Sequence, residues 1–536
     1  MRFAAIIALV FGCSAAARAE TEEQRVDREF AAYGKGNSPG CALGVIRDGS
    51  FVYRKGYGMA SLELGVPLTS QSVFYMGSIS KQFTAASVVL AAEKGFLSLD
   101  DDVRKYIPEI PDYGERITLR QMLHHTSGFR DVLALLGISG RNAEDIHPTD
   151  ELIQLVARQK GLNYRPGDEY LYSNTNYFLA AEVIKRATGK PLSAFAAENI
   201  FRPLGMTHTR FYDDRTAVIP GRVPAYRPGK DGSFLVNWST NFEKVGDGGL
   251  MSSVDDLIFW DRNFYENRLG KGTLLKEMQT RGVLNSGKPI AYALGLEIGK
   301  YRGLPVVEHG GALFGYRTEL LRFPEQRFTV VCLCNLATAG PSGLSRKVAD
   351  IYLEGKLAPL PVQGDAPAGL PSEASALAGT YRDGRTHSVF TFAATGGNLT
   401  AFGMTFKPAG ANRFEVPSGM KAVFDRRTVT VEDEDETLFQ GEKIEVPQLN
   451  PTALVGYAGT FSSTELDAQY KIWVEGNALM VRAGWSPATR LDPVARDEFS
   501  AAGEMTLVFQ RDGNGQVSGL TVFEGRIRNV AFVKVR

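Results

Sequence analysis

The sequence is poor in the residues that build metal centres. It has 4 cysteines and 6 histidines in 536 residues, and neither an H-E-x-x-H nor a Cys-x-x-Cys spacing occurs. His124 and His125 are neighbours, so their side chains do not readily share one ligand geometry. We therefore expect no metal and no cofactor, and we interpret both histidines as residues that brace a loop.

An excess of charge of one sign is also absent. The 60 basic residues balance the 60 acidic ones, so no basic stripe indicates a nucleic-acid partner. No apolar segment has the length that spans a bilayer. A chain of 536 residues with 44% hydrophobic content is too long for one core, and we expect two or more domains.

The N-terminus has the pattern of an export signal. Arg2 precedes an apolar run at 3–11, and small residues then lead to Ala17-Arg18-Ala19. We predict a signal peptide at residues 1–19 and a periplasmic or secreted mature protein. The alternative is a lipoprotein anchored at Cys13.

Cleavage after residue 19 would leave three cysteines. This odd count argues against a disulfide framework. Cys332 and Cys334 alternate onto one face of an expected strand and are interpreted as buried apolar residues, and Cys41 is the third.

The stretch Ser78-Ile79-Ser80-Lys81 offers a nucleophile and its base together, at the start of an apolar run at 82–92. Residues three apart on a helix lie on the same face, about 5–6 Å apart between Cβ atoms. An amine held in an apolar cleft is shifted toward its neutral form and can take the serine proton. The spacing therefore indicates acyl transfer, although Ser418-Gly419-Met420-Lys421 repeats it by chance in an expected turn.

Two further motifs accompany the first. Tyr172-Ser173-Asn174 precedes a helical pattern at 175–188, and His309-Gly310-Gly311-Ala312 precedes apolar segments typical of strands. Tyr265-Glu266-Asn267 repeats the Tyr-x-Asn spacing inside a polar helical stretch and is interpreted as structural.

These three motifs, in this order, resemble those of the penicilloyl serine hydrolases, the group of class C β-lactamases and of related D-stereospecific peptidases and esterases. The part of the sequence that resembles the family extends from about residue 40 to about residue 335. It includes similar segments at 117–129, 201–206 and 248–257. The resemblance implies an α/β fold of the β-lactamase/transpeptidase type: an antiparallel sheet flanked by helices, plus a helical subdomain.

The resemblance also implies the role of each site residue. Ser78 is expected to be the nucleophile, Lys81 its base and Tyr172 the proton shuttle to the leaving group. Asn174 is expected to hold the substrate carbonyl and Lys81, and the amides of Ser78 and Ala312 to form the oxyanion hole.

The third motif departs from the Lys-Thr-Gly that is most common in the family. A histidine at position 309 is expected to titrate near neutrality and to be a weaker anchor for a substrate carboxylate than a lysine. Gly310 and Gly311 are expected to let the substrate backbone approach the strand.

Composition changes after the hydrolase domain, which we place at 20–355. A proline-rich linker is predicted at 356–373. The sequence after the linker contains an internal repeat. Ala378-Gly379-Thr380-Tyr381 corresponds to Ala458-Gly459-Thr460-Phe461, and Phe424-Asp425-Arg426 corresponds to Phe509-Gln510-Arg511. Alternating patterns split by turns predict two small antiparallel β-barrel domains, at 374–449 and 450–536.

A hydrolase domain followed by two barrels resembles the D-aminopeptidase branch of the family. The resemblance implies a peptidase that releases N-terminal D-residues from small peptides or amides through an acyl-enzyme. An esterase or β-lactamase on the same site is the alternative, and a penicillin- or peptidoglycan-binding protein with little turnover is the second. In the D-aminopeptidase branch a loop of a C-terminal barrel reaches the cleft, and we expect the barrels here to restrict the substrate.

Overall fold

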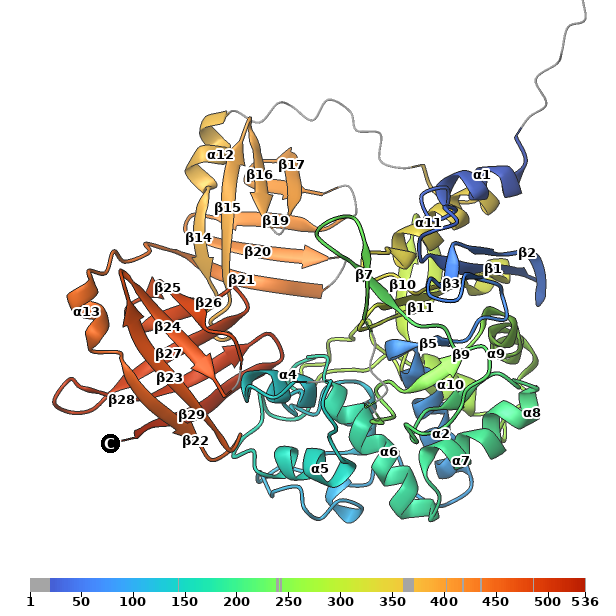
Figure 1. Cartoon of the computed structure of the whole chain (residues 1–536), viewed down its shortest axis with the longest axis horizontal. Coiled ribbons are helices and arrows are strands. Elements are labelled where there is room, and N and C mark those ends of the chain that lie inside the picture. The colour runs from blue at the N-terminus through green and yellow to red at the C-terminus, as the bar shows by residue number, and fades with distance from the viewer. Residues whose placement is uncertain are drawn as a thin grey trace, which may run out of the picture.

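The computed structural model comprises a hydrolase domain and two β-barrels (Figure 1). It describes residues 20–142, 144–237, 241, 243–359, 371–401, 403–416, 419–433, 436–484 and 486–535. The predicted signal peptide at 1–19, most of the predicted linker (360–370) and Ser418 lie outside the described residues. None of the described helices combines the length and the apolar character needed to cross a membrane.

The hydrolase domain is built on a six-stranded antiparallel sheet of order β10-β11-β12-β13-β1-β2. Its strands are β1 (Cys41–Arg47), β2 (Ser50–Tyr57), β10 (Glu297–Tyr301), β11 (Leu304–Leu313), β12 (Tyr316–Phe323) and β13 (Phe328–Cys334). The β1–β2 turn is Asp48-Gly49, both with positive φ (50° and 71°), as a tight hairpin turn requires. An Asp-Gly dipeptide between two apolar runs predicts a β-hairpin, and the antiparallel pairing of β1 with β2 confirms it.

Helices cover both faces of the sheet. On one face, α1 (Glu22–Glu29) packs on α11 (Pro341–Tyr352), which lies against β12 and β13. On the other face, α9 (Val254–Glu266) contacts β1 and β13.

The helical subdomain surrounds α2 (Ser80–Glu93), whose first 12 residues are all buried. It also contains α6 (Asn174–Thr188), which packs on α2 and ends at Gly189 in the left-handed conformation. The remaining helices of this region are α3 (Leu119–Leu123), α4 (Val132–Ile138), α5 (Thr149–Ala157), α7 (Leu192–Ala196), α8 (Arg202–Leu204) and α10 (Leu274–Gln279). Short strands here include β5 (Phe74–Tyr75), β6 (Arg210–Phe211) and β9 (Leu250–Ser252), which form one small sheet.

The cysteines differ from the sequence expectation. Cys41 of β1 and Cys334 of β13 lie directly opposite each other in the paired strands and form a disulfide. Only Cys332 is a free cysteine among the described residues, and it is buried as expected. The odd number of cysteines was not a sufficient argument against a disulfide, because one disulfide plus one buried thiol also gives an odd number.

Each C-terminal domain is a closed eight-stranded antiparallel barrel. The first contains β14 (Gly379–Arg382), β15 (Val389–Thr395), β16 (Asn398–Ala401), β17 (Met404–Gly410), β18 (Arg413–Glu415), β19 (Lys421–Asp425), β20 (Thr428–Asp433) and β21 (Glu436–Ile444). The second contains β22 (Gly459–Ser463), β23 (Ala468–Glu475), β24 (Ala478–Ala483), β25 (Thr489–Ala495), β26 (Glu498–Ala501), β27 (Met505–Arg511), β28 (Val517–Glu524) and β29 (Ile527–Val535). Helices α12 (Pro371–Leu377) and α13 (Pro451–Val455) precede the two barrels.

The sequence repeat corresponds to a structural repeat. The fourth strand of each barrel has a register shift after a proline, Pro408 in β17 and Pro493 in β25. Phe424 and Phe509 occupy the sixth strands and are buried in their own barrels. The two barrels thus have one plan and equivalent core positions.

The second barrel is part of the main core, whereas the first is not. Buried apolar residues of the hydrolase domain and of the second barrel form one cluster, and those of the first barrel form another. At the junction the guanidinium of Arg130 donates to Glu465 (2.6 Å) and to the carbonyls of Arg528 (3.0 Å) and Asn529 (2.8 Å). The second barrel is therefore fixed against the helical subdomain near α4, as Figure 1 shows.

Candidate functional site

Ser78 lies at the entrance of α2, in the 3-10 turn Gly77–Ile79 that leads into the helix. Gly77 has a positive φ of 54°, and a Cβ there would lie 2.7 Å from the backbone nitrogen of Ala312. Glycine is therefore required where this turn contacts β11. The close approach brings the amide of Ala312 beside Ser78, and both residues line the same cavity.

The side chain of Lys81 connects the first two motifs. Its Nζ donates to Ser78 Oγ (3.1 Å), Asn174 Oδ1 (2.9 Å) and the carbonyl of Asp247 (2.7 Å). In its charged form the amine donates to all three acceptors, and in its neutral form the Ser78 hydroxyl donates to Nζ instead, so both forms hold the amine against the serine. The predicted companions Ser78, Lys81 and Asn174 are thus brought together in the structure.

Burial sets the protonation state of this lysine. The Lys81 side chain is fully buried, and loss of hydration lowers its pKa to about 7. The carboxylate of Asp247 acts in the opposite direction, while the positive charges of Lys244 and Arg526 lower the pKa further. A large fraction of Lys81 is therefore neutral near pH 7 and able to accept a proton.

Tyr172 lies beside the lysine and the serine. Its ring is 4.8 Å from Lys81 Nζ, and it lines the cavity together with Ser78. Burial raises the pKa of Tyr172 well above its ordinary value, so the phenol stays protonated. A neutral phenol between the nucleophile and the cavity is suited to pass a proton to a leaving group.

The loop that carries Tyr172 is held by His125. Its Nδ1 accepts from the backbone N–H of Ser173 (3.1 Å) and approaches Asn176 Nδ2 at the same distance. The imidazole lies 4.2 Å from the Tyr172 ring, between centroids. His124 lies in the same loop, with its ring nitrogens near the carbonyls of Arg120 and Thr280.

Asn174 begins α6, and its position depends on Asp131. Its backbone N–H donates to Asp131 Oδ2 (2.6 Å), while Asp131 Oδ1 accepts from the backbone N–H groups of Leu133 and Ala134 at the start of α4. Because the Asn174 side-chain oxygen faces Lys81, its amide N–H₂ is the end available to a substrate carbonyl.

His309 contradicts the expectation of a residue that titrates near neutrality. It is 3% exposed, and burial, assisted by the positive charge of Lys81, lowers its pKa to about 4. Its Nδ1 lies 2.7 Å from the Gly310 carbonyl and its Nε2 3.0 Å from Tyr292 Oη. Since a carbonyl only accepts, Nδ1 carries the proton and Nε2 accepts from Tyr292. His309 is therefore a neutral residue with both nitrogens engaged.

The glycines after His309 have different surroundings. A Cβ on Gly311 would lie 2.1 Å from the carbonyl oxygen of Met76, so this glycine serves strand-to-turn packing rather than the substrate approach expected from sequence. At Gly310 the nearest atom would be Glu319 Oε2 at 3.2 Å. Gly310 thus leaves open the part of the cavity next to Glu319.

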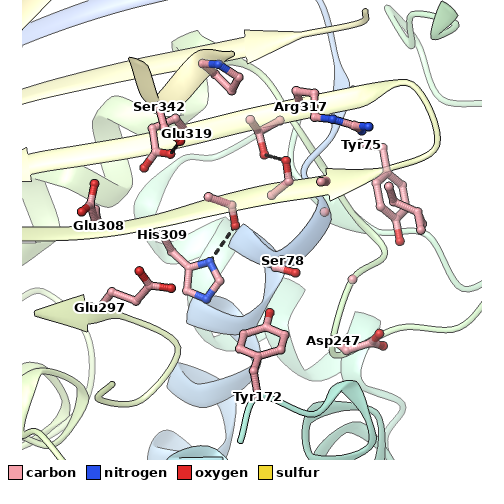
Figure 2. Close-up of a pocket in the computed structure, with 18 of the residues that line it drawn as sticks. Tyr75, Ser78, Tyr172, Asp247, Glu297, Glu308, His309, Arg317, Glu319 and Ser342 are labelled. Atoms are coloured by element: carbon pink, nitrogen blue, oxygen red, sulfur yellow. Dashed lines mark hydrogen bonds between the residues drawn. The ribbon is translucent and has the colours of Figure 1, made fainter. Parts of the chain in front are cut away.

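The site opens into a cavity of about 800 Å³. Figure 2 shows Ser78, Tyr172 and His309 facing it, with Asp247 on one side of Ser78 and Glu297 and Glu308 on the other. A residue of the second barrel also lines it: Arg526, from the β28–β29 turn, with its guanidinium carbon 4.7 Å from the centre of the Tyr172 ring.

Residues with no local signal in the sequence complete the site. Asp131 and Arg526 lie outside the three motifs, and Asp247 lies one position before the block that begins at Gly248. The only hint is the run Gly246-Asp247-Gly248-Gly249, in which Gly246 and Gly249 have positive φ.

The second Tyr-x-Asn sequence, Tyr265-Glu266-Asn267, lies outside the site. Tyr265 lies at the end of α9 with the guanidinium of Arg327 4.3 Å above its ring, and Asn267 ends that helix in the left-handed conformation. Within the described residues, the grouping closest to a metal site is Cys41, Cys332 and Cys334, with sulfur atoms within 4.8 Å of one another. Two of these sulfurs are used by the disulfide.

Known proteins align with almost the full length of this chain. The D-aminopeptidase of Brucella anthropi is 28% identical over 533 residues, which cover 93% of this chain and 96% of that protein. The D-aminopeptidase of Gluconobacter oxydans is 28% identical over 538 residues, with the same coverage.

Solved structures show the same fold at lower identity. The octameric penicillin-binding protein homologue of Pyrococcus abyssi is 20% identical with a TM-score of 0.56, over 87% of this chain and 98% of that chain. The D-amino acid amidase of Ochrobactrum anthropi SV3 is 21% identical with a TM-score of 0.52, over 62% of this chain and 97% of that chain. Residues 20–352, more than half of the sequence, match the beta-lactamase family. The chain belongs to the beta-lactamase family.

Proposed function

We propose that this protein is a serine hydrolase that removes N-terminal D-residues from small peptides and amides through an acyl-enzyme. The observation that carries the proposal is the contact of Lys81 with Ser78, 3.1 Å between Nζ and Oγ, made by an amine whose pKa burial lowers to about 7. The D-aminopeptidases that match almost the full length of the chain support this choice of substrate.

The chemistry follows from the positions of the groups. Neutral Lys81 takes the proton of Ser78 as Oγ attacks the substrate carbonyl, and the amides of Ser78 and Ala312 receive the oxygen that becomes negative. Tyr172 gives its proton to the leaving nitrogen and is reprotonated by Lys81, so that a neutral amine departs, Lys81 becomes neutral again and the acyl group stays on Ser78. Water, deprotonated by the same groups, then releases the acid and restores the Ser78 hydroxyl.

Asp247 supports a substrate with a free amino group. This residue is 5% exposed, lines the cavity beside Ser78, and pairs through Oδ2 with Lys244. Its Oδ1 is buried without a hydrogen-bond partner among the described residues. The negative charge of Asp247 beside the cavity favours a substrate ammonium group, whereas an acetylated amine brings no positive charge.

A substrate panel on the mature protein tests the proposal. We expect higher kcat/KM for D-alanine p-nitroanilide than for its L-enantiomer or its N-acetyl derivative, and low turnover of a cephalosporin. A preference for a nitrophenyl ester without stereoselectivity would assign an esterase, and a burst without turnover would assign a binding protein.

We also propose export from the cytoplasm. The support is the signal pattern at 1–19 together with the disulfide Cys41–Cys334, since disulfides persist in oxidising compartments. Fractionation of the native host distinguishes the two forms: a periplasmic or secreted protein beginning at Glu20 is expected, and a lipid-linked protein would identify the alternative at Cys13.

A further inference from the structure

The second barrel places a cation at the active site. The backbone of the β28–β29 turn is anchored to the hydrolase domain, where the Arg526 carbonyl accepts from Asn163 Nδ2 (2.9 Å) and the Arg528 N–H donates to Asn163 Oδ1 (2.8 Å). The Arg526 side chain then extends over the ring of Tyr172 and lines the cavity, with 45% of its surface exposed. The position of the guanidinium is thus set by a fixed turn.

Among the residues that the structure describes, none accepts a hydrogen bond from this guanidinium. Its nearest carboxylate oxygen is Asp131 Oδ2, at 3.8 Å, which exceeds hydrogen-bond length. Asp131 itself accepts three backbone N–H groups, from Leu133, Ala134 and Asn174. Much of its negative charge is therefore compensated locally, which leaves Arg526 able to bind another anion.

The other cationic side chains that line the cavity are engaged. Arg346 donates twice to Glu308, at 2.7 and 2.9 Å. Arg317 donates to the carbonyls of Phe314 and Tyr316. His309, which occupies the position of the usual family lysine, is neutral and has both ring nitrogens bonded. Arg526 is thus the cation best placed for an anionic group of the substrate.

We propose that Arg526 binds a carboxylate on the leaving group of the substrate, so that the preferred substrates are peptides with a free carboxylate on the residue after the scissile bond. This inference rests on the proposed function, because it takes Tyr172 as the donor to the leaving nitrogen. In a dipeptide, the α-carboxylate is two bonds away from that nitrogen. A nitrogen at the Tyr172 hydroxyl therefore brings the carboxylate to the region of the guanidinium above the ring, where Arg forms bidentate contacts.

The test compares one scissile bond with and without the carboxylate. For the full-length protein, kcat/KM is measured on D-alanyl-glycine and on D-alanyl-glycine amide. We expect the wild-type protein to prefer the free acid, and Arg526→Gln to lower kcat/KM for the acid by roughly ten- to a hundred-fold more than it lowers kcat/KM for the amide. Arg526→Lys keeps the positive charge but cannot form the two parallel hydrogen bonds of a guanidinium. Its preference for the acid is expected to lie between those of the wild-type protein and Arg526→Gln.

Arg496→Gln is the matched control. This arginine lies on the same barrel, with its side chain 90% exposed, and lines no part of the cavity. It is expected to leave both rates unchanged. Because the readout is a ratio of two substrates on one preparation, a partly folded variant does not alter it.

Two results would overturn the proposal. One is a wild-type protein that does not prefer the acid. The other is an equal loss on both substrates in Arg526→Gln, with the acid limb of the pH profile moved to higher pH, which would show that Arg526 acts on the pKa of Lys81 instead.

A second substrate pair separates this inference from the proposed function. Phenyl acetate and 3-acetoxybenzoate differ by a carboxylate on the leaving group and need no amino group. If the D-peptides are not hydrolysed but the wild-type protein prefers 3-acetoxybenzoate and Arg526→Gln removes that preference, the proposed function fails and the Arg526 site stands. If neither pair shows a preference for the carboxylate, the Arg526 site fails.

Discussion

Arg130 of the hydrolase domain and Glu465 of the second barrel form an ion pair of 2.6 Å in which each side chain is only 3% exposed. Gln159 and the carbonyls of Arg528 and Asn529 use further donors of the same guanidinium. The pair therefore lies in a hydrogen-bonded polar network inside the interface, rather than on its rim.

We expect Glu465→Ala to lower the free energy of unfolding by about 3–5 kcal/mol, because it leaves the charge of Arg130 buried without its counterion. Urea denaturation of the full-length protein measures the change. The control is Arg496→Ala, since its partner Asp497 is 3.8 Å away at the surface, and such pairs contribute about 0–1 kcal/mol. An equal effect of both substitutions would mean that the interface does not depend on the buried pair.

Ser78→Ala is expected to abolish hydrolysis and fluorophosphonate labelling, with kcat reduced by about 10⁴-fold or more, because no other hydroxyl touches Lys81 Nζ among the described residues. Ser418→Ala, which alters the second S-x-x-K sequence, should leave both signals intact. Labelling that persists in the Ser78 variant would refute the assignment.

The pH dependence of kcat/KM is expected to have an acid limb near pH 7. Lys81 acts as a base only when neutral, so the rate should fall as the pH drops below its pKa of about 7 and should level off above it. His309→Gln tests the attribution: it is expected to lower the rate without moving the limb, because His309 already lacks its positive charge at that pH, with a pKa of about 4. A limb that disappears in this variant would assign the titration to His309.

Removal of both barrels is expected to relax substrate selection. A protein that ends after residue 356 loses the Arg526 wall of the cavity, so kcat/KM for N-acetyl-D-alanine amide should rise relative to that for D-alanine amide. Active-site titration with a fluorophosphonate supplies the concentration of folded sites, because the shared core is exposed by the cut. An identical ratio in the full-length and shortened proteins would leave the barrels as stabilising or wall-binding appendages.

Thiol counting checks the disulfide. In a protein that lacks residues 1–19, denaturation without reductant should expose one reactive thiol, that of Cys332, and reduction should expose three. Cys41→Ser is expected to lower the free energy of unfolding by about 2–4 kcal/mol. Three thiols before reduction would show that the bond does not form.

Local chemistry explains what the sequence predicts well. The Asp48-Gly49 turn depends on two residues that tolerate positive φ, and α6 begins within one residue of the predicted start. The two barrels could be predicted because the internal sequence repeat identifies equivalent strands, such as those that contain Phe424 and Phe509.

Tertiary features were less accessible. The Cys41–Cys334 bond depends on which strands become neighbours in the sheet, a property that cysteine spacing does not contain. The charge state of His309 depends on its burial and on the charge of Lys81, which is more than 200 residues away in the sequence. Arg526 lies in a hairpin turn with no motif, and only the docking of the barrel brings it to Tyr172.

The anchored β28–β29 turn has a consequence for the time at which the active site becomes complete. Synthesis runs from Ser78 toward Arg526, so the nucleophile, its base and the Tyr172 loop emerge from the ribosome long before the turn that covers them. Until the second barrel has folded and Asn163 has captured the turn, the nascent hydrolase domain has an uncovered cleft. Any substrate selection that depends on the barrel would thus be acquired in the final stage of folding, and its appearance during refolding would report on barrel docking.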